Sequence, residues 1–338
     1  MNLQQHVNLK PYNTFGISAF AEYFAEIHSV DDLLQIINNE TLQNLPKLIL
    51  GGGSNLLFTQ DYKGLIIKNS IKGIEKIKED QQHVFIKAYA GEVWHDLVQY
   101  AINHNYGGIE NLSLIPGQVG AAPMQNIGAY GVEIESVLDS LEAIDLQNGK
   151  TRIFTKNECN FGYRESIFKK EAKGKYCIIS VTLKLNKQPV FNTSYGAIQE
   201  MLQKMNVTEL NIKAISDAVI HIRTSKLPDP KILGNAGSFF KNPEIAKEQF
   251  LQLQQQYLTI PYYPAAEDKI KVPAGWLIEQ CGWKGKRVGN TGSHAQQALV
   301  LVNYGNATGE EIKKLSQQIQ QSVQEKFGID LTPEVNFV

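Results

Sequence analysis

The sequence has only three cysteines among its 338 residues, and Cys159, Cys177 and Cys281 lie far apart with no Cys-x-x-Cys pair. This scarcity excludes a disulfide framework and a cysteine-based zinc site, and it favours a reducing compartment. No stretch approaches the roughly 18 consecutive apolar residues of a membrane span, and the first residues show no basic region followed by an apolar core. We therefore expect a cytoplasmic protein without membrane insertion or a bound metal.

A large net charge is also absent, because 33 basic residues face 34 acidic ones and leave a net charge of -1. No overall field draws the chain to nucleic acid or to an anionic membrane, so any anionic ligand must be bound by a local site. With 43% hydrophobic and 20% charged residues, the chain has the composition of a globular protein of two or three domains.

Short periodic segments predict a helix and two strands near the N-terminus. Ser29, with Asp32 three residues later, is typical of a helix N-cap and precedes an apolar helical stripe. The apolar runs at 47–50 and 64–69 are bounded by glycine and predict buried strands.

The middle of the chain is predicted to be rich in strands. A helical stripe begins at Trp94, and Gly107–Gly108 are expected to end that helix. Asn148–Gly149 lies between two strand-like runs and predicts a hairpin, while apolar residues alternate with others along 177–185.

The last third of the chain predicts a compact α/β domain. A helical pattern ends before Pro228, which indicates a hinge into a further unit. Beyond it we expect a helix at 244–257, a strand at 298–305, and a final helix that begins with a capping box of Thr308 and Glu311.

A first glycine cluster follows a predicted strand in the segment LILGGGSN, residues 48–55. No Gly-Lys-Ser/Thr follows, which excludes a Walker loop, and Leu56 stands where a GxGxxG motif needs its third glycine. Consecutive glycines after a strand can turn several backbone N–H groups toward one phosphate oxygen. Taken alone, such a cluster is more often a tight turn that binds nothing.

A second cluster, residues 107–131, combines repeated glycines with Ala121, Ala122 and Pro123 but lacks the composition of a linker. Small residues let a large planar ligand lie against the main chain, whose N–H and C=O groups can read its edges. An ordered loop with only a structural role is the alternative. The two clusters together favour a ligand.

Eight motifs resemble, in order and spacing over nearly the whole chain, the UDP-N-acetylenolpyruvoylglucosamine reductases. They are NTFGI, GGGSN, IPGQVGAAPMQNIGAYG, FGYRES, KLPDP, GNAGSFFKNP, AGWLIEQCG and PEV. The resemblance implies an α+β fold with an FAD-binding part like that of vanillyl-alcohol oxidase and a C-terminal α/β substrate-binding domain. It implies domains at 1–70, 71–222 and 223–338, with the tail 331–338 returning to the active site.

That family reduces UDP-N-acetylglucosamine enolpyruvate to UDP-N-acetylmuramate for peptidoglycan synthesis, with NADPH as reductant and non-covalent FAD as carrier. By the resemblance, the two glycine clusters hold FAD. The implied cofactor-binding residues are Gly51, Gly52, Gly53, Ser54, Asn55, Pro116, Gly117, Gly120, Ala121, Gln125, Asn126, Gly128, Ala129, Tyr130 and Gly131.

Three residues match the catalytic positions of the family. Ser238 matches its proton donor, and a well-placed hydroxyl suffices because the carbanion-like centre left by hydride addition is a strong base. Arg164 and Glu334 match the groups that stabilise the developing enolate beside the substrate carboxylate. Taken alone, each residue has an ordinary structural explanation. Ser238 could be a turn residue, Arg164 could form a surface ion pair, and Glu334 could lie on a solvent-exposed edge.

The resemblance also implies a set of substrate contacts. These are Tyr163, Tyr195, Arg223, Lys226, Asn242, Tyr263 and Gln297. Tyr195 matches a tyrosine on a mobile loop that closes over substrate in the longer subclass of the family. Many relatives have Glu-Val-Arg near the C-terminus, whereas this chain has Asn336 in place of the arginine, which puts one contact near Glu334 in doubt.

Two other functions stay open at this point. One is a flavin-dependent oxidase of the same fold, and the other is a non-catalytic nucleotide-binding protein. No NADPH fingerprint is present, so we expect NADPH and the enolpyruvyl sugar to use one site in turn. We expect a monomer.

Overall fold

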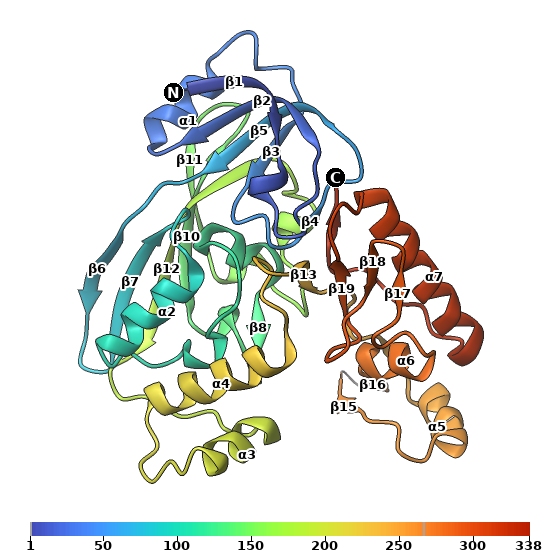
Figure 1. Ribbon diagram of the computed structural model, residues 1–338. Helices are drawn as coiled ribbons and strands as arrows, with labels where there is room; N and C mark the ends of the chain where they lie inside the picture. The colour runs from blue at the N-terminus through green and yellow to red at the C-terminus, as the bar shows by residue number, and fades with distance from the viewer. Residues whose placement is uncertain (1, 266–267) are drawn as a thin grey trace. The chain divides into compact units, whose positions relative to one another are not determined.

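The computed structural model describes residues 2–265 and 268–338, and Figure 1 shows its ribbon. The chain divides into two compact units, each formed from segments that are distant in sequence. Unit 1 comprises the chain up to Val7, Ala21–Gly53 and Tyr62–Thr224, whereas unit 2 comprises Asn8–Phe20, Ser54–Asp61 and Ser225–Val338. The GGGSN segment is therefore divided, with its glycines in unit 1 and its last two residues in unit 2.

The N-terminal sheet has the strand order β1-β2-β5-β3, and β5 pairs in parallel with both β2 and β3. The bounds are Asn2–Asn8 for β1, Phe20–Ile27 for β2, Tyr62–Asn69 for β5 and Lys47–Leu50 for β3. The two predicted strands are thus confirmed. Helix α1, Val30–Ile37, begins at the predicted capping box of Ser29 and Asp32, and its buried residues share a core with β2 and β5.

A five-stranded antiparallel sheet with the order β11-β10-β12-β7-β6 forms the other half of unit 1. Its strands are Thr151–Thr155, Leu138–Asp145, Tyr176–Asn186, His83–Tyr89 and Ile74–Glu79. The predicted hairpin joins β10 to β11. Along β12 the polar residues Ser180 and Thr182 are buried as well. One hydrophobic core includes Val181 and Leu183, and another includes Cys177 and Ile179.

Helix α2, Trp94–Asn103, packs its apolar stripe into the core of this sheet. The expectation that Gly107–Gly108 end the helix is wrong. Asn105 adopts a left-handed backbone with φ 57°, and the Tyr106 N–H donates to the Ala101 carbonyl at 2.8 Å. An asparagine therefore serves as the C-terminal breaker where glycine is more usual, because its side chain tolerates this backbone region.

Helices α3, Gly196–Lys204, and α4, Ile212–Lys226, follow the sheet, and α4 ends before Pro228 as predicted. The segments that connect the main strands and helices of unit 1 contain short helices and strands. They are η2 Glu110–Leu112, η3 Val119–Gln125, β8 Gly128–Ala129, β9 Val132–Glu133, η4 Ile134–Ser136, η5 Asn157–Cys159 and η6 Ile167–Lys169.

Unit 2 contains a sheet with the order β13-β19-β18-β17, and α7, Gly309–Phe327, packs against β18 and β19. The strands are Gly234–Ser238, Val300–Asn303, Thr291–Ser293 and Arg287–Val288. The capping box of Thr308 and Glu311 at the start of α7 is confirmed. Unit 2 also contains η1 Lys10–Tyr12, α6 Ala274–Gln280, and the parallel pair β4 Leu56–Leu57 and β20 Asn336–Phe337.

Two predicted boundaries in unit 2 are wrong. The predicted helix at 244–257 begins as strand β14, Glu244–Ala246, which pairs with β16, Lys269–Lys271, and only Lys247–Gln256 form helix α5. β16 also pairs with β15, Tyr263–Pro264. Pairing with a strand from later in the chain therefore makes Glu244–Ala246 a strand and not the start of a helix. The strand predicted at 298–305 spans 300–303, because a turn places the Val300 N–H on the Gln297 carbonyl.

Candidate functional site

The two glycine clusters come into contact in unit 1. A Cβ placed on Gly52 would lie 3.0 Å from the Cα of Gly117, and one on Gly51 would lie 3.4 Å from Oε1 of Gln118. Gly53 has a positive φ of 63°. Two main chains therefore run side by side, and this close approach depends on glycine. Consecutive glycine N–H groups in such a turn can converge on one phosphate oxygen.

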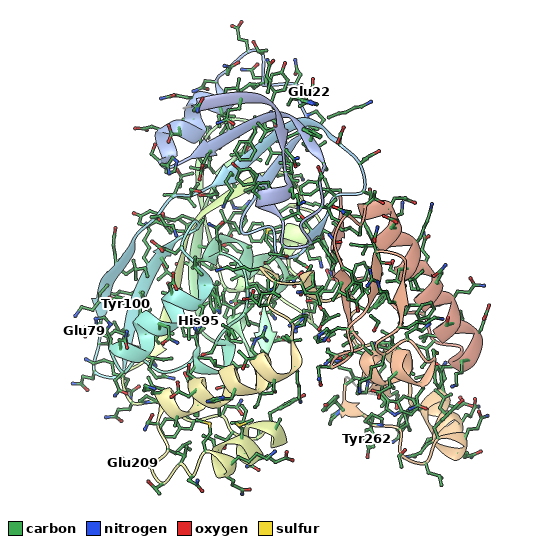
Figure 2. All side chains as sticks on the ribbon, viewed as in Figure 1. Glu22, Glu79, His95, Tyr100, Glu209 and Tyr262 are labelled. Carbon is green, nitrogen blue, oxygen red and sulfur yellow. The ribbon has the colours of Figure 1, made fainter. Side chains whose placement is uncertain are left out.

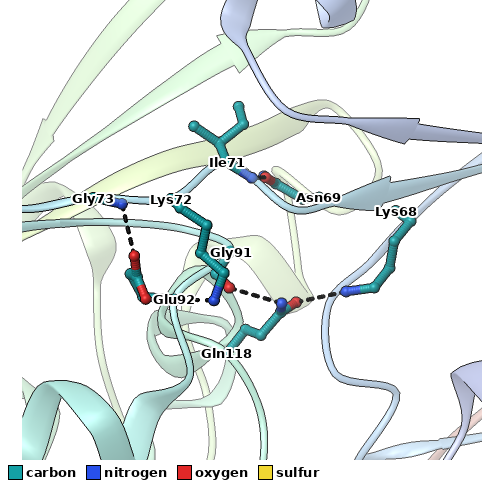
Figure 3. A network of polar contacts seen from close by, with 8 residues as sticks. All are labelled: Lys68, Asn69, Ile71, Lys72, Gly73, Gly91, Glu92 and Gln118. Atoms are coloured by element: carbon teal, nitrogen blue, oxygen red, sulfur yellow. Dashed lines mark hydrogen bonds and ion pairs between the residues drawn. The ribbon is translucent and has the colours of Figure 1, made fainter. Parts of the chain in front are cut away.

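A lysine that the sequence interpretation missed lies beside this turn (Figure 3). Lys68 stands near the end of β5, in register with Leu50, the last residue of β3 before the glycines. Its Nζ donates to Gln118 Oε1 at 3.0 Å, and Gln118 Nε2 donates to the Gly91 carbonyl at 2.8 Å. Burial lowers the pKa of the Lys68 ammonium below its ordinary value. The carboxyl ends of parallel strands lie at one edge of a sheet, where ligands often bind. The position of Lys68 at the end of a predicted strand was therefore the signal that could have identified it.

Figure 3 also shows the support on the other side of Gln118. Glu92 accepts from the Gly73 N–H at 2.7 Å and pairs with Lys72 at 3.4 Å. The N–H of Val119 donates to the Glu92 carbonyl at 2.9 Å. The loop that carries Gln118 is therefore fixed from two sides.

The loop then bends back through a short hairpin of β8 and β9, whose turn is Tyr130–Gly131. Both turn residues have positive φ, 50° and 80°, as a tight two-residue hairpin turn requires. Buried Asn126, also left-handed, donates to Glu133 Oε2 at 2.7 Å and accepts from the Glu135 N–H at 3.1 Å. These polar contacts hold Asn126 in the left-handed region, which asparagine tolerates better than most residues with a side chain.

The other predicted cofactor residues differ in exposure. Pro116 and Ala121 are exposed, whereas Gly120, Gln125, Gly128 and Ala129 are partly buried. A Cβ on Gly120 would meet Ala90 at 2.5 Å, so glycine lets the loop pack closely on the end of β7.

Arg164 belongs to the same part of unit 1. Gly162 and Glu165 exchange backbone hydrogen bonds of 3.1 Å in both directions, which makes Tyr163–Arg164 the tip of a tight turn. Arg164 has a φ of 55°, and its Nη2 donates to the Gly128 carbonyl at 2.8 Å. Its guanidinium lies 5.4 Å from the ring centre of Tyr163. The predicted carboxylate-binding cation is therefore joined to the predicted cofactor loop.

Ser238 and Glu334 are brought together in unit 2. Ser238 is exposed at the end of β13, directly before Phe239 and Phe240, which are fully buried. The Glu334 N–H donates to the Phe239 carbonyl at 2.8 Å, so the C-terminal tail lies beside the residues that follow Ser238. The buried rings anchor this strand, and the flanking serine hydroxyl stays accessible.

The same tail contacts the second half of GGGSN. Asn55 Nδ2 donates to the Glu334 carbonyl at 3.2 Å, and the backbone N–H of Asn336 donates to the Asn55 carbonyl at 3.1 Å. Asn336 Nδ2 donates to that carbonyl as well, at 3.1 Å. Asn336 thus has a structural partner in this chain. Ser54 belongs to the same segment of unit 2.

The predicted substrate residues fall into two groups by unit. In unit 2, Asn242 Oδ1 accepts from the Ala274 N–H at the start of α6 at 3.0 Å, and a Cβ on Gly275 would lie 3.0 Å from Gln297 Oε1. Asn242 and Gln297 thus lie at the same end of α6. Tyr263 is exposed on β15, and Lys226 is exposed at the last residue of α4.

The unit 1 group lies around the β8–β9 hairpin. The rings of Tyr130 and Tyr195 meet edge to face with centres 5.4 Å apart. Burial raises the pKa of the Tyr130 hydroxyl, and the charge of nearby Arg223 opposes this effect. In the described part of the chain, no helix is long and apolar enough to cross a membrane, and no cluster of three or more His, Cys, Asp or Glu side chains is arranged to bind a metal ion.

Comparison with known proteins agrees with this geometry. Residues 21–155 match the model of an FAD binding domain, and residues 229–338 match that of the UDP-N-acetylenolpyruvoylglucosamine reductase C-terminal domain. The reductases of that name from Amoebophilus asiaticus and Flavobacterium johnsoniae are 54% and 52% identical, each aligned over all of both chains. The crystal structure of the Thermus caldophilus reductase covers 100% of this chain and 99% of its own, with a TM-score of 0.70 and 24% identity.

The fold and the matched domains define the chain as an FAD-dependent oxidoreductase, and the predicted fold class is confirmed. The chain belongs to the UDP-N-acetylenolpyruvoylglucosamine reductase family. Its activity is that of a UDP-N-acetylmuramate dehydrogenase, which uses NADPH and acts in peptidoglycan precursor synthesis. The oxidase and the non-catalytic alternatives are thereby set aside.

Proposed function

We propose that this chain reduces the enolpyruvyl group of UDP-N-acetylglucosamine enolpyruvate with Ser238, Arg164 and Glu334 as its catalytic residues. The observation that carries the proposal is the placement of these residues. Arg164 donates to the Gly128 carbonyl of the glycine-rich loop, and the tail bearing Glu334 is hydrogen-bonded to Phe239, the residue directly after Ser238. Bound FAD supplies the hydride, which it takes from NADPH.

The proton in this reaction comes from Ser238. Hydride adds to the enolpyruvyl carbon farther from the carboxylate, so negative charge develops on the adjacent carbon and spreads into the carboxylate. That centre is basic enough to take a proton from a hydroxyl, provided the hydroxyl is positioned within hydrogen-bond reach. The exposure of Ser238 between a left-handed Gly237 and two buried rings supports this role.

Arg164 and Glu334 stabilise the charge that develops on the substrate carboxylate. A guanidinium offers a planar fork that matches a carboxylate, and Arg164 is held by its turn and by the Gly128 carbonyl before substrate arrives. A fixed cation of this kind acts without reorganisation during the reaction. Glu334 is proposed to stabilise the same developing charge.

Gly51–Gly53, Ser54–Asn55 and the residues of the 116–131 loop would hold the FAD pyrophosphate and ring. Lys68, which donates to Gln118, would add positive charge to this set of residues. The non-covalent character of the flavin is part of the proposal.

Tyr195 is proposed to close over the substrate as in the longer subclass of the family. Its ring rests on Tyr130, so the loop before α3 already lies on the β8–β9 hairpin. Closure would exclude water from the developing enolate. Tyr163, Arg223, Lys226, Asn242, Tyr263 and Gln297 complete the proposed substrate contacts.

We further propose a monomeric, cytoplasmic protein in which NADPH and the enolpyruvyl sugar use one site in turn. The division into 1–70, 71–222 and 223–338 remains part of the same proposal. Double competitive substrate inhibition would support the shared site. NADPH oxidation that is unaffected by saturating sugar would contradict it.

An anaerobic absorbance experiment tests the proposed reaction in one cuvette. NADPH should bleach the yellow protein, and UDP-N-acetylglucosamine enolpyruvate should then restore the flavin colour. A protein that bleaches but is not recoloured by this sugar would contradict the proposed substrate.

Arg164→Met is expected to lower kcat/KM for the enolpyruvyl sugar by about 10²-fold or more, because removing one preorganised charge from a reaction centre has effects of this size. Arg152→Met is the matched control, since Arg152 is an exposed arginine of unit 1 that pairs with Glu158. Steady-state kinetics on both variants gives the comparison. Equal activity of Arg164→Met and Arg152→Met would exclude the proposed role.

Gly52→Val is expected to weaken FAD binding at least about tenfold, because its side chain would enter the space beside the Gly117 backbone. Gly196→Val is the control, since a Cβ there meets nothing within 4 Å. Flavin retained after dilution and ultrafiltration measures the effect. Normal retention by Gly52→Val would contradict the assignment of this turn to the cofactor.

A further inference from the structure

Leu114 has an unusual backbone for a bulky residue. Its φ is 57°, in the left-handed region that non-glycine residues other than asparagine and aspartate rarely adopt. It stands two residues before Pro116 and three before Gly117, at the entry to the loop assigned to FAD. Such a conformation persists only where the surroundings impose it.

Two side chains from different helices impose this conformation. The Leu114 N–H donates to Nδ1 of His95 at 3.0 Å, and the Leu114 carbonyl accepts from Nε of Arg223 at 3.2 Å. His95 lies in the first turn of α2, and Arg223 lies near the end of α4. Both polar groups of one strained residue are therefore held by side chains, rather than by the backbone or by solvent.

The neighbouring residues connect this contact to the flavin loop. The Trp94 N–H donates to the Gly117 carbonyl at 3.0 Å, and Val93 forms an antiparallel bridge with Gln118. The backbone of Val93 and Trp94, at the start of α2, therefore holds residues 117–118. The side chain of His95, the following residue, holds Leu114. Between these two attachments only Ile115 and Pro116 remain, so a change at Leu114 must displace the approach to Gly117.

The His95 contact depends on protonation. Nδ1 accepts a hydrogen bond, which a neutral imidazole can do and an imidazolium cannot, because both of its nitrogens carry protons. In the described part of the chain, Asp96 on the same helix and Arg223 on α4 are the charged groups that face His95. Burial, with a smaller contribution from Arg223, lowers the pKa of His95 below its ordinary 6.5, against the opposing effect of Asp96. The folded protein thus favours the accepting form.

We propose that neutral His95 is a positioning residue, which with Arg223 holds Leu114 left-handed and so fixes the Gly117 backbone for FAD, and that its protonation weakens FAD binding in acid. The inference rests on the proposed assignment of the 116–131 loop to FAD. The sign follows from the hydrogen bond. Because the bound conformation needs neutral His95, its contribution is complete above pH 6.5 and is lost as the pH falls through the lowered pKa of His95.

The test measures release of FAD from the diluted holoprotein between about pH 8 and pH 5, without NADPH or sugar, from the fluorescence of free flavin. His95→Leu should bind FAD about tenfold more weakly at neutral pH, because the Leu114 N–H loses its acceptor. His95→Asn keeps an acceptor oxygen near the position of Nδ1 but cannot be protonated. It should bind FAD nearly as tightly as the wild type at neutral pH and retain it in acid.

His104→Asn is the matched control, since His104 lies directly after α2, where its Nδ1 contacts the Tyr100 carbonyl and its ring packs against the rings of Tyr100 and Tyr106. It should release FAD in acid as the wild type does. Leu114→Gly introduced into His95→Leu should recover part of the lost affinity, because glycine adopts positive φ without the imposed strain. If His95→Leu does not fold, the comparison of His95→Asn with the wild type still decides the acid dependence.

Two results would overturn the proposal. One is tight FAD binding by His95→Leu at neutral pH, and the other is acid release from His95→Asn equal to that of the wild type. Gly52→Val separates this failure from a wrong loop assignment. If Gly52→Val binds FAD weakly while His95→Leu binds it normally, only the His95 proposal fails; if both bind normally, the loop assignment itself is wrong.

Discussion

Ser238→Ala should slow the reoxidation of reduced flavin by the enolpyruvyl sugar on the order of 10² to 10⁴-fold, because this is the usual contribution of a positioned proton donor. Reduction of the flavin by NADPH needs no proton from this residue and should keep its wild-type rate. Anaerobic stopped-flow absorbance separates the two half-reactions. The contrast between them carries the prediction, since a general loss of folding would impair both.

Ser238→Cys provides the comparison variant. A thiol can donate a proton from nearly the same position, so part of the reoxidation rate should return. The buried rings of Phe239 and Phe240 fix the strand whichever side chain stands at 238, so neither variant should unfold unit 2. If Ser238→Ala reoxidises as fast as the wild type, another group donates the proton.

Gly309→Ala should destabilise unit 2 by about 3 kcal/mol, which is at the upper end for overpacking by one methyl group. A Cβ on Gly309 would overlap the carbonyl oxygen of Phe58 and lie 3.0 Å from the Cα of Thr59. Both obstacles are backbone. The segment cannot easily retreat, because the Thr59 N–H donates to the Val338 carbonyl at 2.8 Å. Denaturant unfolding measures the loss.

Gly196→Ala is the matched control for that experiment. Gly196 is the first residue of α3, as Gly309 is the first residue of α7, and neither has a positive φ. A Cβ on Gly196 meets open space, so alanine should be neutral or stabilising by up to about 1 kcal/mol. Equal unfolding midpoints for the two variants would show that the Phe58–Thr59 segment moves to accommodate the added methyl group.

Local signals predicted the elements that local interactions stabilise. The capping boxes of Ser29 and Thr308 and the Asn148–Gly149 hairpin were all readable, because each depends on residues within a few positions of one another. The start of α5 was not readable. Glu244–Ala246 form a strand because Lys269–Lys271 pair with them from more than twenty residues away, and no local pattern encodes that partner.

The candidate site shows the same division. The family resemblance of the motifs around Ser238, Arg164 and the glycine clusters predicted their roles, and the residue types suit proton donation, carboxylate binding and close backbone approach. Lys68 and His95 carried no such signal. Lysine at the end of a strand and histidine at the start of a helix are common, and their importance depends on the distant groups they meet, Gln118 and Leu114.

The sequence by itself determined the family, the flavin chemistry, the locally stabilised elements and the residues available to the site, because these depend on which side chains are present and on short-range order. Only the tertiary structure decided that Gly52 meets Gly117, that the tail bearing Glu334 pairs beside Ser238, and that Leu114 and Arg164 adopt left-handed backbones. These features are stabilised by contacts between segments far apart in the chain. Strained conformations in particular have no local preference to predict them, since the surrounding fold alone makes them the lowest in free energy.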